Sequence, residues 1–386
     1  MAGTTYTPRE MIDTLIGFDT TSRDSNLELI HFVRDYLDGH GIASTLIHDE
    51  TGTKANLFAT VGPEGNGGVA LSGHTDVVPV DGQDWASDPF TVVERDGRLY
   101  GRGTSDMKSF SAIALALVPV MQAKGLKRPI HFALSYDEEV GCLGVHSLVD
   151  YLVKTGLRPQ AVIVGEPTEM KVVNAHKGAF SFYTTVTGLE GHSSATDKGV
   201  NSIYYAAELI GFLQRLAEEM KTEQVNDRFD PPYTTVHVGT VHGGTAQNII
   251  PRETVFTWEC RVVPGGDGIE LRDRFAAFAE REVLPRMREV FPQAAIRIDP
   301  RSSIPPLLPQ DGSPAESLVL ALAGSNQTHA VSYGTEAGIF QLETQVPTVV
   351  CGPGNIREAH KPNEFIELSQ IEACTAFMQR LIAHLS

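Results

Sequence analysis

Residues 71–108 read LSGHTDVVPVDGQDWASDPFTVVERDGRLYGRGTSDMK, and they predict the order of elements on which the fold depends. The apolar start of this stretch continues a run from Gly68 and predicts a strand that ends at His74-Thr75-Asp76. A polar, glycine-containing loop follows. Asp106 then precedes an alanine-rich helix that we expect from Met107 to Lys124, kinked at Pro119. The stretch therefore predicts a strand, a metal-binding loop and a helix.

His74 and Asp76 are separated by one residue, so their side chains share a face at the end of an extended segment. One can bind a metal ion while the other orients its ring, because a metal-binding imidazole usually donates its second N–H to a carboxylate or carbonyl oxygen. Taken alone, the pair is more often a surface histidine beside an aspartate in a turn.

Length and composition limit the classes of protein to consider. With 386 residues the chain exceeds one ordinary domain, so we expect two. Its 41% hydrophobic and 20% charged residues are typical of a soluble globular protein, and no apolar run reaches the roughly 20 residues that span a bilayer. The net charge of −17 repels polyphosphate. We therefore expect no membrane and no nucleic-acid partner.

The N-terminus and the cysteines indicate a cytoplasmic protein. The first ten residues contain neither a basic nor an apolar region of a signal peptide. The four cysteines are scattered and form no C-x-x-C pair, which is typical of reduced thiols rather than of disulfides or a structural zinc site: Cys142, Cys260, Cys351 and Cys374. We expect a cytoplasmic location and no functional role for the thiols.

The pattern of elements changes at Gly178. Before it, strands alternate with helices, beginning with a capping box at Thr7-Pro8-Arg9-Glu10, and this alternation predicts an α/β layer with a mostly parallel sheet. After it, strands and helices follow the order β-α-β-β-α-β of a ferredoxin-like unit. A proline-rich stretch, residues 300–314, indicates a connector. We expect a discontinuous catalytic domain of residues 1–178 and 297–386, interrupted by an inserted domain of residues 179–296.

Metal-binding residue types recur where the strands of the first domain are expected to end, and this is the edge at which open α/β sheets bind ligands. Two imidazoles and three carboxylates suit a pair of borderline divalent ions, zinc first, with one further carboxylate left as a base. The positions are His74, Asp106, Asp137-Glu138-Glu139, Glu166 and His360. Individually, consecutive acids are more often a solvated turn and a single histidine a surface residue, so their joint occurrence supports the metal site.

The chain resembles the dinuclear zinc aminoacylase and carboxypeptidase family. The resemblance covers nearly the whole chain and is carried, in order, by GHTDVVP (73–79), GRGTSDMK (101–108), DEEVGCLG (137–144), VGEPT (164–168), EGHSS (190–194), GGTAQNIIP (243–251) and GPGNIREAHKP (352–362). It implies an α/β fold: a mostly parallel-sheet zinc hydrolase domain with an inserted ferredoxin-like α+β domain that mediates homodimerisation.

The resemblance also implies roles for single residues. Asp106 would bridge two zinc ions, for which Co²⁺ is a possible substitute. His74 and Glu166 would complete one site, Glu139 and His360 the other. A non-proline cis peptide would follow Asp106. Glu138 would be the general base, and His192 would reach the active site of the partner subunit. Asp76 is a further catalytic candidate because of its spacing to His74.

Three residues are candidates for holding the substrate. The resemblance implies this role for Asn248 and Arg261, and the planar fork of Arg261 suits an α-carboxylate. Asn248 follows two glycines and is equally explained by a turn, and Arg261 by a surface salt bridge. Glu336 is the first candidate to bind a basic substrate side chain, with support of the site from behind as the alternative.

The implied activity is hydrolysis of the amide bond of an N-acyl amino acid. Within the family, residues 333–338 and 351–354 most resemble those of members that remove acetate from N2-acetyl-L-ornithine, a step of arginine biosynthesis. A desuccinylase or a broader N-acyl-L-amino-acid deacylase with the same two-zinc mechanism is the alternative. A remote alternative from another class is a zinc-binding or peptide-binding dimer without turnover, which the presence of Glu138 disfavours.

Overall fold

The computed structural model describes residues 3–386, which form two units. Unit 1 contains the described residues up to Ala175 together with Leu307–Ala330 and Thr335–Ser386. Unit 2 contains His176–Pro306 and Val331–Gly334. Residues 1 and 2 of the expected catalytic segment lie outside the described residues.

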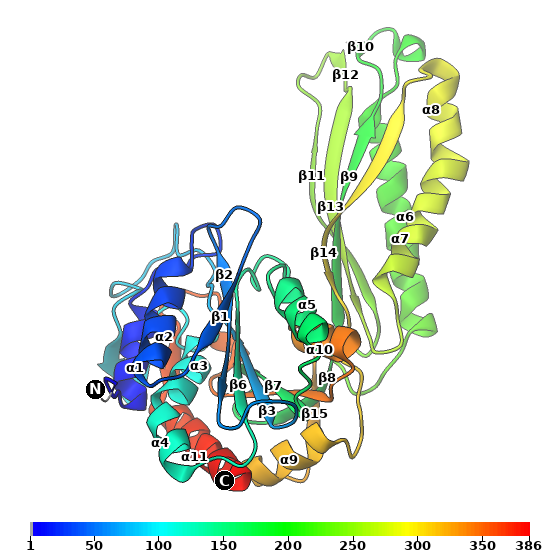
Figure 1. The fold of residues 1–386 in the computed structure, drawn as a ribbon. Coiled ribbons are helices and arrows are strands. Elements are labelled where there is room, and N and C mark those ends of the chain that lie inside the picture. Colours follow the sequence, from blue (N-terminus) through cyan, green and yellow to red (C-terminus); the bar gives the residue numbers. More distant parts are fainter. Residues whose placement is uncertain (1–2) are drawn as a thin grey trace. The chain divides into compact units, whose positions relative to one another are not determined.

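Unit 1 is built on an eight-stranded sheet with the order β1-β2-β6-β3-β7-β16-β8-β15 (Figure 1). The four central strands, β6, β3, β7 and β16, are parallel to their neighbours in this group, whereas β1, β2 and β8 pair antiparallel at the two sides. The bounds are β1 (Ser44–His48), β2 (Ala55–Val61), β3 (Val69–His74), β6 (Ile130–Ser135), β7 (Ala161–Pro167), β8 (Val172–His176), β15 (Thr328–Val331) and β16 (Thr348–Gly352).

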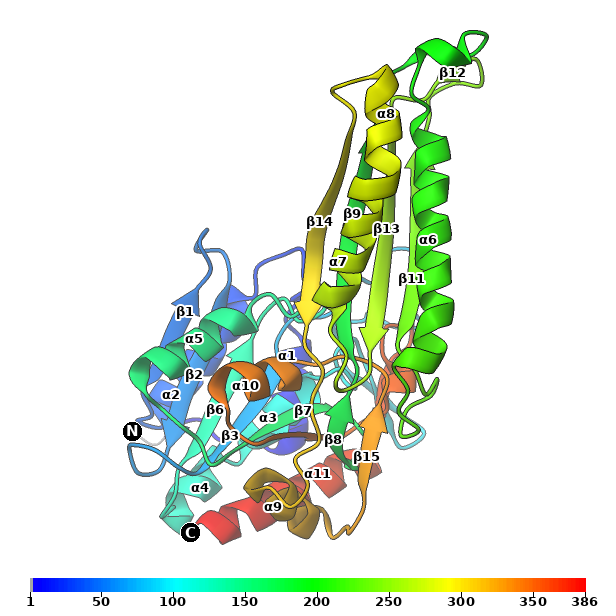
Figure 2. The same ribbon diagram turned by 90° about the vertical axis from the view of Figure 1, so that its right-hand side faces the viewer.

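Helices cover both faces of this sheet, which is why β3, β6 and β7 are buried along their whole length. One large apolar core joins the sheet to α1 (Pro8–Ile16), α2 (Leu27–Gly39), α3 (Lys108–Ala116), α4 (Val118–Lys124), α9 (Pro314–Ala323) and α11 (Leu368–Leu385). The face of the sheet opposite to this core carries α5 (Val145–Thr155) and α10 (Ala337–Thr344) (Figure 2). A small sheet of β4 (Val93–Arg95), β5 (Arg98–Tyr100) and β17 (Phe365–Glu367) and the short helix η3 (Ile356–Glu358) complete the unit.

Two sequence predictions concern helix ends. The capping box is confirmed: the Thr7 side chain accepts from the Glu10 N–H, and the Glu10 side chain accepts from the Thr7 N–H. The expected helix from Met107 to Lys124 is divided at Leu117 into α3 and α4. Pro119 lies in the first turn of α4, where its missing N–H costs nothing, so the chain restarts a helix instead of bending one.

Unit 2 is a four-stranded antiparallel sheet with the order β11-β13-β9-β14, and its helices lie on one face (Figure 2). This is the strand order of a ferredoxin-like unit, as the sequence predicted. Alternate residues of β13 are buried against the helices. The bounds are β9 (Gly178–Thr187), β10 (Gly191–His192), η1 (Thr196–Lys198), α6 (Ser202–Glu223), β11 (Thr235–Gly243), β12 (Ile249–Ile250), β13 (Glu253–Val262), α7 (Gly268–Phe278), a π-helical turn (Ala279–Val283), α8 (Leu284–Val290) and β14 (Ala295–Ile304).

The prediction of a connector from residue 300 onward is wrong at its start. β14 continues to Ile304, and the expected return to the first domain at residue 297 falls inside this strand. Pro300 is accommodated because β14 is an edge strand with an irregular register between Pro300 and Ser302. Within the described part of the chain, no further strand pairs with the outer side of β14, so no hydrogen bond is lost there through the missing N–H of Pro300. Among residues 3–386, no helix has the length and apolarity needed to cross a bilayer.

Candidate metal centre and active site

The central strands of unit 1 bring the predicted residues together at one edge of the sheet. β6, β3 and β7 are parallel neighbours, so their carboxyl ends meet. His74 ends β3, Glu138 and Glu139 follow β6, and Glu166 lies at the end of β7. Proximity of these side chains follows from the topology alone.

Asp106 contacts both imidazoles through different oxygens. Its Oδ1 lies 3.1 Å from His74 Nε2, and its Oδ2 lies 3.3 Å from His360 Nε2. His360 Nε2 is also 3.0 Å from Glu139 Oε2, whereas His74 Nε2 is 3.8 Å from Glu166 Oε1. The peptide bond from Asp106 to Met107 is cis, as the resemblance implied. One carboxylate thus stands between two groups, each with an imidazole and a carboxylate.

The donor atoms are close enough to share metal ions. Ligand atoms of His74, Asp106 and Glu139 lie within 4.8 Å of one another, as do those of His74, Glu138 and Glu166. Glu138, expected to act as a base, therefore also has a carboxylate oxygen within 4.8 Å of a ring nitrogen of His74. His360 is the exposed member of the set, with 54% of its side chain accessible.

Burial and mutual repulsion disturb the titration of these groups. Burial, with repulsion from neighbouring carboxylates, raises the pKa of Glu138 and Glu166 well above their usual range and that of Glu139 to about 7. Burial alone would also raise the pKa of Asp106, but hydrogen bonds with His360 and His74 lower it below its usual range. Hydrogen bonds with Asp106 and Glu139 raise the pKa of His360 to about 10.

This donor set fits divalent cations. Buried charges of one sign are tolerated in proteins when they are paired or coordinate metals, and imidazole with carboxylate oxygen is a typical ligand set for zinc. His74 Nδ1 contacts a main-chain carbonyl, which directs Nε2 toward the carboxylates, as a metal-binding imidazole requires. The residues present therefore suit a two-metal centre.

Asp76 supports this centre in a way that the sequence did not specify. His74 Nδ1 lies 2.9 Å from the main-chain oxygen of Asp76 and 3.6 Å from its carboxylate. The carboxylate instead accepts from the N–H groups of Glu138 (3.1 Å) and Glu139 (3.3 Å) and from Ser22 Oγ (2.7 Å). Asp76 thus fixes the histidine through its backbone and the two glutamates through its side chain.

Cys142 contacts the candidate base, a contact that the scattered cysteines did not lead us to expect. Its buried Sγ donates to Glu138 Oε1 at 3.3 Å. The contact forms because residues 138 and 142 lie on either side of a tight turn closed by the bond from the Cys142 N–H to the Glu138 carbonyl. The thiol therefore holds one oxygen of the candidate base.

Glu336 is buried against β3, the strand that ends at His74. Its side chain is 1% exposed, Ser72 Oγ donates to its Oε2 at 3.3 Å, and burial raises its pKa to about 7. The expected metal ligands His74 and Glu166 are buried to a similar degree, so burial does not decide between the two roles of Glu336. Binding of a basic substrate side chain and support of the site from behind both stay predictions.

The three remaining candidates belong to unit 2. His192 in β10 pairs with Ile249 in β12, and the Ser193 N–H donates to the Asn248 carbonyl, so His192 and Asn248 lie near each other. Arg261 lies on β13 and donates through Nε and Nη2 to both carboxylate oxygens of Glu259, at 3.2 and 3.1 Å. The salt bridge that the sequence left open for Arg261 is thus present.

Sequence reasoning missed two fully buried residues beside the centre. Glu364 and Arg102 form an ion pair at 2.6 Å, and Glu364 also accepts from the Asp106 N–H at 3.0 Å. The available signal was position: Glu364 follows His360 by four residues, and Arg102 precedes Asp106 by four. Two residues of opposite charge, each four positions from an expected metal ligand, are candidates for an ion pair beside the metal site.

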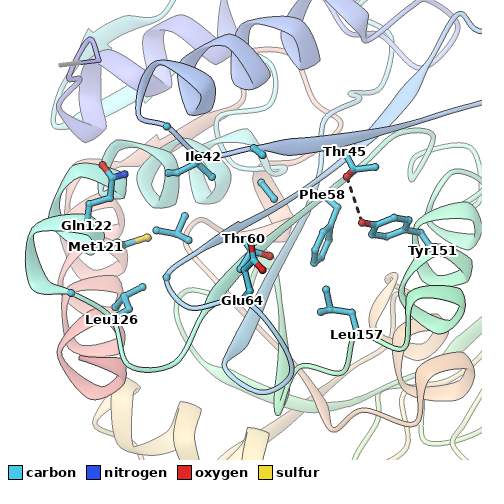
Figure 3. Close-up of a pocket in the computed structure, with 16 residues that line it drawn as sticks. Ile42, Thr45, Phe58, Thr60, Glu64, Met121, Gln122, Leu126, Tyr151 and Leu157 are labelled. Carbon is cyan, nitrogen blue, oxygen red and sulfur yellow. Dashed lines mark hydrogen bonds between the residues drawn. The ribbon is translucent and has the colours of Figure 1, made fainter. Parts of the chain in front are cut away.

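A separate cavity of about 600 Å³ lies in unit 1 at the β1–β2 side of the sheet (Figure 3). Phe58 and Tyr151 line one side, Met121 and Leu126 the other, and Thr45 Oγ1 lies 3.4 Å from Tyr151 Oη. The residues that line it include none of the metal-site candidates. This cavity is therefore distinct from the candidate active site.

Comparison with known proteins agrees with this geometry. The model of peptidase family M20/M25/M40 matches residues 70–384. The chain belongs to this family. It is 36% identical to an acetylornithine deacetylase of Myxococcus xanthus over 100% of this chain and 99% of that protein. It is 34% identical to an acetylornithine deacetylase of Proteus mirabilis over 94% and 91%.

Solved structures show the same fold. An M20 family metallo-carboxypeptidase from Sulfolobus solfataricus matches with a TM-score of 0.75 and 17% identity over 97% of this chain and 98% of that chain. The family and the donor set together identify the chain as a metal-dependent hydrolase with a candidate metal site at the carboxyl edge of the unit 1 sheet.

Proposed function

We propose that this member of the M20/M25/M40 family hydrolyses N2-acetyl-L-ornithine to L-ornithine and acetate, a step of arginine biosynthesis. The observation that carries the reaction type is the position of Asp106 between two imidazole–carboxylate groups, with Glu138 beside them. The acetylornithine deacetylases named above, similar over nearly their whole length, support this substrate.

The metal ions would be two zinc ions, with Co²⁺ as a possible substitute. His74, Asp106 and Glu166 would hold one, and Asp106, Glu139 and His360 the other, following the two groups of contacts. When bound, such cations lower the pKa of water and polarise the acyl carbonyl. The imidazole and carboxylate donors favour zinc over the harder cations that prefer oxygen alone.

Glu138 would serve as the general base. Cys142 holds its Oε1, and the contact of its backbone N–H with Asp76 fixes the start of its side chain. Burial raises its pKa, so the carboxylate is a stronger proton acceptor than an exposed glutamate. Glu138 would take a proton from the attacking water and pass it to the departing amine.

His192, Asn248 and Arg261 would hold the substrate, but unit 2 separates them. His192 and Asn248 lie beside β12, next to the beginning of β13, whereas Arg261 lies at the end of β13. The seven residue-to-residue steps from Thr254 to Arg261 span about 23 Å at roughly 3.3 Å per step. One amino-acid substrate does not bridge this distance, so His192 and Arg261 of the same chain would serve different active sites.

This separation supports a homodimer formed through unit 2. β11 is an edge strand of the unit 2 sheet, and exposed apolar side chains lie on it and on neighbouring elements: Val241, Ile249, Ile203 and Tyr204. In the dimer, His192 of one subunit would enter the active site of the other and donate a hydrogen bond to the developing oxyanion. Arg261 would bind the α-carboxylate with the guanidinium donors that Glu259 does not engage.

The substrate assignment is tested by kcat/KM on N-acetylornithine, N-acetylcitrulline, N-succinyl-diaminopimelate and N-acetylmethionine, with zinc-reconstituted and chelated enzyme. We expect a preference for N-acetylornithine of about tenfold or more, since a site that pairs with a charged substrate group rejects analogues that lack it. Chelation should abolish turnover. A flat or succinyl-directed profile would exclude this substrate while retaining the metal-dependent mechanism.

The role of the dimer is tested by mixing inactive subunits. His192→Ala and Glu138→Gln homodimers should each be nearly inactive. A mixed dimer should regain up to half of the wild-type activity, because one of its two sites combines an intact Glu138 with an intact His192. Differently tagged subunits, copurified through both tags, provide the sample. Verified mixed dimers without recovery would show that His192 acts within its own chain.

A further inference from the structure

Glu364 occupies a position that no catalytic role explains. It is 1% exposed, and its Oε1 accepts three main-chain N–H groups, from Gly103 (3.1 Å), Ser105 (2.8 Å) and Asp106 (3.0 Å). Its Oε2 accepts from Arg102 Nη1 at 2.6 Å. A single buried carboxylate therefore organises the backbone of residues 102–106, up to the residue whose side chain stands between the two imidazoles.

Glu364 belongs to the other loop of the centre. It lies four residues after His360, which has a left-handed backbone (φ 63°), and immediately before β17, which pairs with β5. The side chains of Asp106 and His360 meet at 3.3 Å. Glu364 thus joins, through the backbone, two loops whose side chains meet again at the candidate metal site.

A second connection runs parallel to the first. Arg102 Nη2 donates to Gln83 Oε1 at 2.8 Å, and Gln83 Nε2 donates to the carbonyl of His360 at 3.2 Å. The Arg102 guanidinium also lies over the Trp85 ring, 5.2 Å from its centroid. The buried ion pair is therefore connected to both ends of the His360 loop, at Glu364 itself and at the His360 carbonyl.

We infer that Glu364 is a positioning residue that couples the Asp106 loop to the His360 loop and so sets the affinity for the metal ion that His360 binds. The inference rests on the proposed metal assignment. A merely stabilising residue would change thermal stability alone, since loss of one partner of a buried ion pair destabilises a protein. Groups that orient metal ligands typically also change metal affinity about 10–100-fold when altered.

The test replaces Glu364 with glutamine, which has the same shape. Its amide oxygen can still accept hydrogen bonds from the three N–H groups. Its NH₂ group, which replaces the carboxylate oxygen beside Arg102, is a donor and cannot accept the hydrogen bond of the guanidinium. We expect the dissociation constant of the more weakly bound zinc ion to rise about 10–100-fold, with a smaller change for the other ion. At saturating zinc, kcat should return to within a few fold of wild type.

The measurement titrates metal-free protein with Zn²⁺ in competition with a chromophoric chelator, and repeats it with Co²⁺, whose absorption spectrum reports the ligand geometry. Neither readout requires a substrate. Wild-type protein that binds fewer than two ions would overturn the metal assignment itself. Wild-type protein that binds two ions, beside a Glu364→Gln variant with unchanged affinities, would overturn the role of Glu364 alone.

Glu316→Gln is the matched control. Glu316 is a buried glutamate of the same unit that accepts from a side chain, Asn174 Nδ2 (2.6 Å), and from the Gly312 N–H (3.0 Å), outside the metal-site loops. This variant should lower thermal stability without changing either metal affinity. Equal loss of metal affinity in both variants would show that general destabilisation, and not loop coupling, is responsible.

Gln83→Leu keeps the inference testable if Glu364→Gln does not fold. Gln83 is only partly buried, and the substitution leaves the ion pair between Arg102 and Glu364 intact while removing the link to the His360 carbonyl. We expect a several-fold weaker affinity for the same ion. Unchanged affinity in a folded Gln83→Leu protein would contradict the coupling.

Discussion

Glu138→Gln should reduce kcat by about 10²–10⁴-fold, the usual contribution of a general base, while metal content stays near that of the wild type. Glutamine has the size of glutamate, and its amide oxygen can still accept from Cys142 Sγ, so the turn after β6 should remain intact. The amide does not take up the proton that the attacking water must lose. The loss should therefore appear in kcat and not in metal binding.

The experiment measures kcat, KM and bound metal on the same preparation. Glu343→Gln is a suitable control, because Glu343 lies on α10 of the same unit and pairs with His146, away from the centre. That variant should retain wild-type turnover. A Glu138→Gln enzyme with two bound ions and normal kcat would remove Glu138 from the mechanism.

Asp106→Asn should weaken metal binding by more than about 100-fold. Loss of a group that only orients a metal ligand typically weakens binding by up to about 100-fold, whereas the Asp106 side chain contacts both imidazoles directly. An amide presents one oxygen and one NH₂ group, so it can approach only one of two cations as an acceptor. We expect at most one ion per chain after dialysis in a defined zinc buffer, with activity lost in proportion.

Metal analysis and kcat/KM over a range of free zinc concentrations would check this result. Asp150→Asn changes an exposed aspartate on α5 of the same unit and should leave both quantities unchanged. Retention of two tightly bound ions by Asp106→Asn would show that Asp106 does not bridge the metals.

The sequence predicted most of the centre because strand ends in a parallel sheet converge. His74, Glu138, Glu139 and Glu166 follow or end three neighbouring strands, and a pattern of strands is enough to place them together. The ferredoxin-like unit was predictable for a similar reason, since its alternation of buried and exposed residues reflects a sheet covered on one face.

Other features depend on contacts that a linear pattern does not contain. The acceptor of His74 Nδ1 is a carbonyl and not the Asp76 carboxylate, a choice made by backbone geometry. Glu336 and Glu364 are both acidic and both beside the centre, yet only packing shows that each is enclosed. Pro300 suggested a connector because the sequence does not reveal that its strand lies at an edge.

The placement of β16 has a consequence for how the enzyme is made. β16 lies between β7 and β8, although the ribosome produces both of those strands, and all of unit 2 up to Pro306, before it. The sheet is therefore complete only after residues 348–352 have been made, and His360 follows them. We expect the metal site to form late in biosynthesis, because a chain that ends before β16 contains His74, Asp106, Glu138, Glu139 and Glu166 without His360 and without the strand that completes their sheet.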